Sequence, residues 1–245
     1  MSTSTDVPLL HGAQWRRVVV LGDSIAEGVR EPYDGYRDLS WTDHIADALV
    51  AAVPDLEVTN LGRRSLLAAE VRETQLDSGL RLRPDLAIVA AGGNNALHAS
   101  FAADDVAREL AAIVAPLRQI GADVLMIELL DIVASGLIPR EHAGPLDDRL
   151  RALAEVTRTV ARDHDAMLVE MRRHPASADP DIYANDRIHL NARGHAIVGA
   201  EAVRVLRTTL VARQALWPLA LDLSEEDVTD QLFWPHRSPG QWILG

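Results

Sequence analysis

A serine and an aspartate–histidine pair are the residues of this chain best suited to covalent chemistry. Ser24 lies two residues after Gly22, which ends the apolar stretch "RRVVVLG". A serine at a turn from strand to helix is exposed at the top of a sheet, near the positive end of the helix, and its own N–H can point at a developing oxyanion. The same position suits a serine that simply caps the helix, so "GDS" alone leaves both interpretations open.

The aspartate–histidine pair lies near the other end of the chain, in "ANDRIHLNARGH". Asp186 and His189 are three residues apart, so they can share one turn. The carboxylate can then hydrogen-bond one ring nitrogen and leave the other nitrogen facing a serine. The alternative is a solvated polar loop in which Asn191 caps the last helix. His195 is a rival base, but it sits a turn into that helix, where a role on the helix face fits better.

Strand-like and helix-like segments alternate along the chain and would position these side chains. Short apolar runs predict five strands, and segments of helical period predict the helices between them. This pattern predicts an α/β fold, with a parallel sheet between helices and with sites beyond the carboxyl ends of the strands. The expected strands span residues 16–22, 56–62, 84–93, 122–130 and 166–171, and the expected helices span 40–53, 66–76, 104–121, 145–164 and 191–216.

Composition narrows the possible chemistry. The chain has 245 residues, of which 48% are hydrophobic and 24% charged, which is typical of a soluble globular protein. Its net charge of -12 opposes binding to nucleic acid or to an anionic membrane. The chain lacks cysteine and lysine, which removes disulfides, thiolate nucleophiles and Schiff-base chemistry. The sequence has no residue spacing typical of a metal site. It also has no apolar run long enough to span a membrane and no signal-peptide pattern, so the expected location is cytoplasmic.

Four sequence blocks occur in order on this strand–helix frame: "GDSI" (22–25), "NLGRRS" (60–65), "GGNN" (92–95) and "DRIH" (186–189). With these blocks the sequence resembles the SGNH hydrolases, also called GDSL lipases or acylhydrolases, from about residue 16 to residue 211. The resemblance implies a three-layer α/β/α sandwich with a flavodoxin-like, five-stranded parallel sheet and a site at the strand ends.

The resemblance also implies roles for individual residues. Ser24 resembles the nucleophile, His189 the general base that takes its proton, and Asp186 the carboxylate that fixes the histidine tautomer. Gly62 and Asn94 resemble oxyanion-hole donors, through a backbone N–H and a side-chain amide, beside the N–H of Ser24.

Four residues near these blocks are weaker candidates for substrate contact. Asn95 stands where the family usually has an aspartate, and an amide both donates and accepts, so the loop that aims the neighbouring oxyanion donor could be held differently. Asp23 adjoins the nucleophile. Arg63 either binds a carboxylate or phosphate of the substrate or is simply solvated. Ile132 lies in a Gly- and Pro-containing segment, "DIVASGLIPREHAGP", where a substrate-shaping loop would sit, and it either lines an acyl pocket or covers the sheet.

The chain is therefore expected to comprise an N-terminal extension (1–15), a hydrolase domain (16–213) and an aromatic tail (214–245). The tail holds three of the five tryptophans. Such an apolar segment is expected to pack on the domain or on a second subunit, which would form a homodimer.

The expected function is that of a serine esterase that cleaves a small-molecule carboxylic ester through an acyl-serine intermediate, without metal or cofactor. The low aromatic content of 4% and the short loops predict a shallow cleft, which favours a short acyl group such as acetyl. One alternative is an acyltransferase with the same triad, and another is a non-catalytic binding module, which would have lost a triad member. A nucleotide-binding protein is disfavoured because "LGDSIAEG" lacks the G-x-G-x-x-G spacing.

Overall fold

The structure is a computed structural model that describes residues 9–214. The aromatic tail, and with it the expected dimer contact, lies outside the described residues except for Gln214. Part of the expected N-terminal extension does lie within them. Leu10 and Trp15 are buried in the hydrophobic core, and the indole N–H of Trp15 donates to Asp123 Oδ2 at 2.8 Å. Residues 9–15 are therefore packed against the core.

A five-stranded parallel sheet forms the centre of the fold, as the sequence predicted. Its spatial order is β3-β1-β4-β5-β6, so the strand order reverses beside β1. Every residue of β4 is buried, whereas the edge strand β3 is mostly exposed and is shorter than predicted. The strands are β1 (Arg17–Gly22), β3 (Glu57–Asn60), β4 (Leu86–Ala90), β5 (Asp123–Glu128) and β6 (Met167–Glu170).

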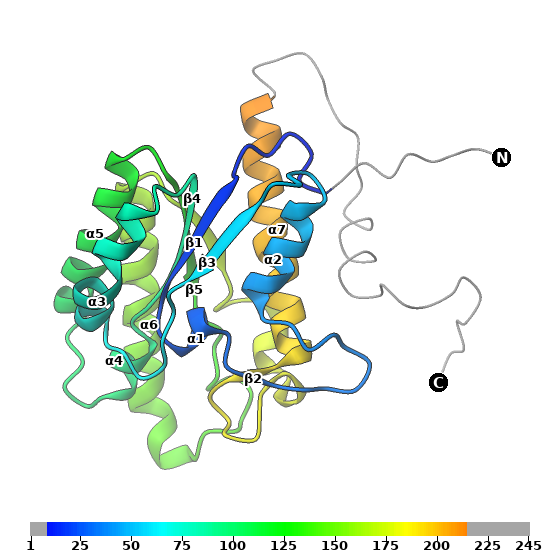
Figure 1. The fold of residues 1–245 in the computed structure, drawn as a ribbon. Coiled ribbons are helices and arrows are strands. Elements are labelled where there is room, and N and C mark those ends of the chain that lie inside the picture. The colour runs from blue at the N-terminus through cyan, green and yellow to red at the C-terminus, as the bar shows by residue number, and fades with distance from the viewer. Residues whose placement is uncertain (1–8, 215–245) are drawn as a thin grey trace.

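Helices cover both faces of the sheet and complete the three layers (Figure 1). On one face α2 packs against α7, and on the other α5 packs against both α3 and α6. No helix within residues 9–214 combines the length and the apolarity needed to cross a bilayer. The long helices are α2 (Trp41–Val50), α3 (Ala68–Arg81), α5 (Ala103–Gln119), α6 (Arg140–Asp163) and α7 (Ala192–Gln214).

Short elements that the sequence pattern did not predict lie mainly beyond the carboxyl edge of the sheet. Two one-turn helices follow β1 and β4 directly, and a two-stranded parallel ladder joins β2 to β7. A single turn carries too few residues to show a helical period, so periodicity cannot reveal it. These elements are α1 (Ser24–Glu27), α4 (Gly93–Leu97), β2 (Arg30–Glu31), β7 (Leu190–Asn191) and the 3₁₀ turns η1 (Pro175–Ala178) and η2 (Pro180–Ile182).

The start of α6 corrects one prediction. The sequence pattern predicts a helix from residue 145, but the helix begins at Arg140 and contains Pro145. Proline lacks an N–H, so the helix forgoes the hydrogen bond that residue 145 would otherwise donate to the carbonyl of residue 141. The predicted substrate-shaping loop is therefore shorter, because its last residues are helical.

Candidate active site

Ser24 is placed at the carboxyl end of β1 by a close approach of two strands. Gly22 has a φ of +147°, and a Cβ on it would lie 1.8 Å from the carbonyl oxygen of Ala90. The next residue, Asp23, caps α1 by accepting from the Ile25 N–H at 3.0 Å. The helix cap is thus the aspartate rather than the serine, which leaves the Ser24 hydroxyl available for chemistry.

A hydrogen-bonded chain joins Ser24, His189 and Asp186. The Ser24 Oγ lies 2.8 Å from His189 Nε2, and His189 Nδ1 lies 2.6 Å from Asp186 Oδ2. Ser24 is buried, whereas the His189 side chain is 21% exposed. The three residues that the sequence analysis singled out are therefore brought together from opposite ends of the domain.

The ionisation state of Asp186 determines where the protons lie in this series of hydrogen bonds. Burial opposes the ionisation of Asp186, but hydrogen bonds from the His189 ring and from two backbone N–H groups hold the pKa of this carboxyl below its ordinary value. An ionised carboxylate only accepts hydrogen bonds, so His189 Nδ1 carries the proton. His189 Nε2 is then the acceptor for the Ser24 hydroxyl, which is the arrangement a general base requires.

Local turns and a short ladder hold the loop that carries the pair. The Oδ1 atom of Asp186 accepts from the N–H groups of Ile188 and His189, both at 2.9 Å, so one carboxylate oxygen closes the turn and the other holds the ring. The ladder between β2 and β7 ties this loop to the segment after α1. Asn191 accepts from the Gly194 N–H at 3.1 Å and so caps α7, a role that coexists with the Asp186–His189 contact.

His195, the rival base, has a structural position. Its Nδ1 accepts from the Trp41 N–H at 3.0 Å, at the start of α2, and its Nε2 donates to the Val29 carbonyl at 3.1 Å. Burial lowers the pKa of His195 to about 4, so the ring is neutral at pH 7. Both ring nitrogens already have partners, and neither partner is Ser24.

The two residues expected to form the oxyanion hole differ in availability. The Asn94 Nδ2 donates to the Leu66 carbonyl at 3.0 Å, and its second hydrogen remains for a ligand. The Gly62 N–H instead donates to Asn60 Oδ1 at 2.8 Å, which occupies the predicted donor. A Cβ on Gly62 would lie 2.4 Å from the backbone nitrogen of Glu27, so this glycine is required for close packing against α1.

Two of the weaker candidates lie away from the cavity beside Ser24. The Asn95 Oδ1 accepts from the Ala68 N–H at 2.9 Å, at the start of α3, so this amide acts as a helix cap. Arg63 is exposed, and its backbone N–H donates to the Gly22 carbonyl at 3.1 Å. Neither residue lines the cavity, whereas Asp23 and Ile132 both do.

Asp23 is a buried carboxyl group next to the nucleophile. Burial raises the pKa of Asp23 to about 6, against weaker opposing effects from the N–H groups of Ile25, Gly93 and Gly92 and from the charge of His189. Its Oδ2 atom has no hydrogen-bond partner among the described residues. An unpaired buried oxygen favours the protonated form, because ionisation would leave a charge without solvent.

Two amides, the buried Gln75 and the exposed Asn60, help to position Ser24 and were not predicted. Gln75, on α3, donates to the Gly22 carbonyl at 2.9 Å and accepts from the Gly22 N–H at 2.8 Å. Asn60, at the end of β3, donates to the Ala26 carbonyl at 2.8 Å and so holds α1. Asn60 belongs to one of the quoted blocks, so its position was the available signal, whereas Gln75 lies in an ordinary helical segment.

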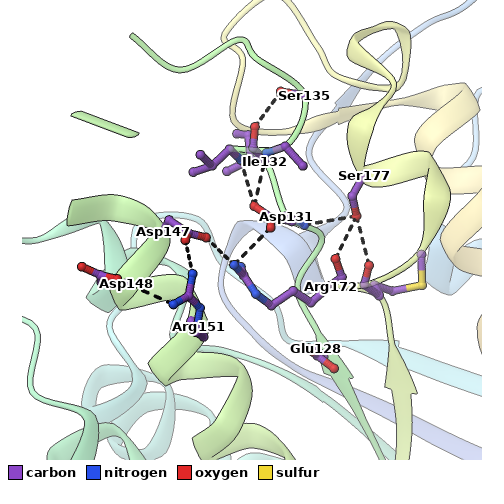
Figure 2. A network of polar contacts seen from close by, with 12 residues as sticks. Glu128, Asp131, Ile132, Ser135, Asp147, Asp148, Arg151, Arg172 and Ser177 are labelled. Carbon is purple, nitrogen blue, oxygen red and sulfur yellow. Dashed lines mark hydrogen bonds and ion pairs between the residues drawn. The ribbon is translucent and has the colours of Figure 1, made fainter. Parts of the chain in front are cut away.

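A charged network fixes the segment that follows β5 (Figure 2). Arg172 lies between Asp131 and Asp147, with its guanidinium 3.1 Å from Asp131 Oδ2, and its side chain is only 10% exposed. The Asp131 N–H donates to the Ser177 hydroxyl at 3.2 Å. The network joins the segment carrying Ile132 to α6 and to the chain after β6, so it holds one wall of the cavity beside Ser24.

No group of three or more His, Asp or Glu side chains within residues 9–214 is arranged to bind a metal ion. Ser24, His189 and Asp186 have the arrangement that can activate a serine hydroxyl, in which a histidine acts as the base and a carboxylate orients it.

A family model described as the GDSL-like lipase/acylhydrolase family matches residues 20–197. No curated protein matches the chain.

Solved structures share the fold at low sequence identity. LAE5, an alpha/beta hydrolase from the metagenome of Lake Arreo in Spain, has a TM-score of 0.65 and 18% identity over 81% of this chain and 97% of its own. Axe2, an acetylxylan esterase from Geobacillus stearothermophilus, has a TM-score of 0.64 and 16% identity over 81% and 96%. The psychrotrophic esterase EstA from Pseudoalteromonas sp. has a TM-score of 0.62 and 17% identity over 80% and 98%. These likenesses support the three-layer fold.

Proposed function

This chain belongs to the GDSL-like lipase/acylhydrolase family, and we propose that it hydrolyses a carboxylic ester through an acyl-enzyme intermediate on Ser24. The observation that carries the proposal is the unbroken chain from Ser24 through His189 to Asp186. Structures of Axe2 with a substituted serine, aspartate or histidine are described as catalytic mutants, and there the aspartate also precedes the histidine by three residues. Family membership supports a carboxylic ester hydrolase, and the proposal adds which residues act and that water completes the reaction.

In the first half of the reaction the enzyme is acylated. The Ser24 Oγ attacks the ester carbonyl carbon while its proton moves to His189 Nε2, and Asp186 stabilises the resulting imidazolium. The free amide hydrogen of Asn94 and the Ser24 N–H are the donors for the negative oxygen of the tetrahedral intermediate. Collapse of this intermediate breaks the ester C–O bond, and the leaving alcohol takes the proton from His189.

In the second half water replaces the alcohol. His189 removes a proton from water, the hydroxide attacks the acyl carbon, and collapse returns the proton to Ser24 and releases the acid. An acceptor alcohol in place of water would complete acyl transfer with the same residues. No contact in the described residues favours such an acceptor, so hydrolysis is the function proposed.

The test is hydrolysis of 4-nitrophenyl acetate and butanoate by the wild-type protein and by Ser24→Ala. The wild type is expected to turn over at least one of these esters, and Ser24→Ala to lower kcat by about 10⁴-fold or more. Ser100→Ala, an exposed serine after α4, is the matched control and should keep wild-type kcat. Turnover by Ser24→Ala at the wild-type rate would overturn the assignment.

Covalent labelling checks the same residue independently of turnover. A 4-nitrophenyl alkylphosphonate should release nitrophenol and leave its phosphorus on the Ser24 oxygen, which peptide mass spectrometry locates. The structure of EstA described as inhibited by monoethylphosphonate makes this probe a natural choice. Product analysis with added alcohol separates hydrolysis from transfer: free acid supports the proposal, and a predominant new ester would favour an acyltransferase.

A further inference from the structure

A cavity of about 210 Å³ opens beside Ser24, where the sequence predicted a shallow cleft. Ser24, His189 and Asn94 line it, so it is continuous with the reacting groups. It also reaches Trp41 on α2 and Val198 on α7, each of which is only 1% exposed. The cavity thus runs from the reacting groups into the core beneath the helical layer.

The remainder of the cavity surface offers almost no hydrogen-bonding groups. The Trp41 indole N–H donates to the Ile25 carbonyl at 2.8 Å, and the Tyr183 hydroxyl donates to the Ser177 carbonyl at 3.2 Å. The other polar side chains are the reacting groups and the buried Asp23, and the rest of the lining is aliphatic, including Leu130 and Ile132. A sugar hydroxyl placed among these aliphatic side chains would lose its hydrogen bonds with water and gain none there.

We propose that this cavity binds the acyl part of the substrate and selects an unsubstituted hydrocarbon chain of about six to ten carbons. The inference rests on the proposed function, because it places the ester carbonyl at Ser24. An apolar cavity of roughly 150 Å³ holds a benzene ring of six carbons, so a cavity of about 210 Å³ has room for roughly eight carbons. An acetyl group would leave most of the cavity empty. Water would not fill the remaining space favourably, because aliphatic side chains offer it no hydrogen-bond partners.

The wall near Leu130 and Ile132 sets the acyl-chain selection. Both residues lie in the segment between β5 and α6 that the Arg172 network holds in place (Figure 2). A rigid wall gives a sharp length limit, because a chain longer than the cavity must displace packed side chains rather than a mobile loop. Each methylene buried before that limit is expected to raise kcat/KM by up to about fourfold, which corresponds to its transfer from water.

The experiment measures kcat/KM for a series of 4-nitrophenyl esters from acetate to hexadecanoate with the wild-type protein. The expected profile rises from acetate to a maximum between hexanoate and decanoate, and falls for dodecanoate and longer chains. A maximum at acetate or butanoate would overturn the inference, and so would activity that continues to rise to hexadecanoate.

Two substitutions by tryptophan test which part of the protein selects the length of the acyl chain. Leu130→Trp fills the cavity and is expected to lower the ratio of octanoate to acetate kcat/KM at least about tenfold. Leu137→Trp changes a half-buried leucine of the same segment that does not line the cavity, and should keep the wild-type ratio. Equal ratios in the two variants would place the selection elsewhere and contradict the inference.

Failure of this inference differs from failure of the proposed function. If the protein cleaves esters but prefers acetate, the acyl cavity is wrongly assigned and Ser24 remains the nucleophile. If no ester of any length is cleaved and the phosphonate leaves Ser24 unlabelled, the proposed function itself fails. The wild-type profile alone decides the first point, so the result does not depend on the folding of any variant.

Discussion

The side chain of Gln75 makes two hydrogen bonds with the backbone of Gly22, accepting from its N–H at 2.8 Å and donating to its carbonyl at 2.9 Å. The Gln75 side chain lies on α3, and Gly22 is the last residue of β1, two positions before Ser24. The amide therefore makes the hydrogen bonds that a neighbouring strand would make to the last residue of β1. It fixes where the chain turns away from the sheet and so positions Ser24.

Replacing this amide by a hydrocarbon is expected to disturb both stability and catalysis. Gln75→Leu leaves the buried Gly22 N–H without a partner, which should lower the free energy of unfolding by about 2 kcal/mol. Misplacement of Ser24 should lower kcat about tenfold, with less effect on KM for a short ester. Urea unfolding and ester kinetics measure the two effects. Gln119→Leu, at an exposed position on α5, is the control, and equal behaviour of the two variants would contradict the positioning role.

The residues that lie together at the strand ends could be predicted from sequence, whereas the groups that hold them in place could not. Ser24 and the Asp186–His189 pair stand in short motifs whose spacing reflects a local turn. Gln75 bonds a backbone group 53 positions away, and nothing in its own helix signals that contact. The structure gives a packing reason for Gly62 that its motif did not, since a Cβ there would meet the backbone of α1, and its N–H donates to Asn60 Oδ1.

Exchange of Asn95 for aspartate tests whether this unusual residue affects the site. Only the Asn95 Oδ1 contacts the Ala68 N–H, and a carboxylate oxygen can accept the same bond at the start of α3. Asn95→Asp should therefore keep kcat within about twofold and raise the free energy of unfolding by about 0.3–1 kcal/mol, because a negative charge suits a helix N-terminus. Asn95→Leu should lower the free energy of unfolding by about 1 kcal/mol, because the Ala68 N–H loses its acceptor. A large fall in kcat for Asn95→Asp would mean that the amide itself aims Asn94.

Substitution of the two histidines near the start of α7 is expected to have opposite effects on kcat and on stability. His189→Gln removes the proposed base and should lower kcat by about 10⁴-fold or more with little change in stability. His195→Gln leaves the Trp41 N–H unpaired and should lower the free energy of unfolding by about 1–3 kcal/mol while kcat stays within about threefold. Thermal melts and ester assays at pH 8 measure both quantities. A loss of kcat in His195→Gln as large as that in His189→Gln would make His195 part of the catalytic machinery.

The buried Asp23 should give the protein a distinctive pH dependence. Its pKa rises to about 6 in the folded protein from an ordinary value of 3.8, so the folded state binds the proton more tightly than the unfolded chain. This group therefore stabilises the fold at low pH, and its contribution is lost as pH rises from about 4 through about 6. Relative to Asp23→Asn, which does not titrate, the wild type should lose roughly 2 kcal/mol between pH 4 and pH 7. Urea unfolding at several pH values measures this difference, and a constant difference would show that Asp23 does not titrate in this range.

Arg172 is expected to be worth more to the fold than an exposed arginine, because it neutralises two carboxylates in a place that water scarcely reaches. Arg172→Met leaves Asp131 without a counter-charge and should lower the free energy of unfolding by about 3 kcal/mol. Arg162→Met breaks only an exposed pair with Asp163 and should cost less than about 1 kcal/mol.

Because the network holds the Ile132 wall, Arg172→Met should also broaden the acyl-length profile, whereas Arg162→Met should leave it unchanged (Figure 2). Urea unfolding and the ester series report the two effects, and an unaltered profile in Arg172→Met would separate the network from substrate selection.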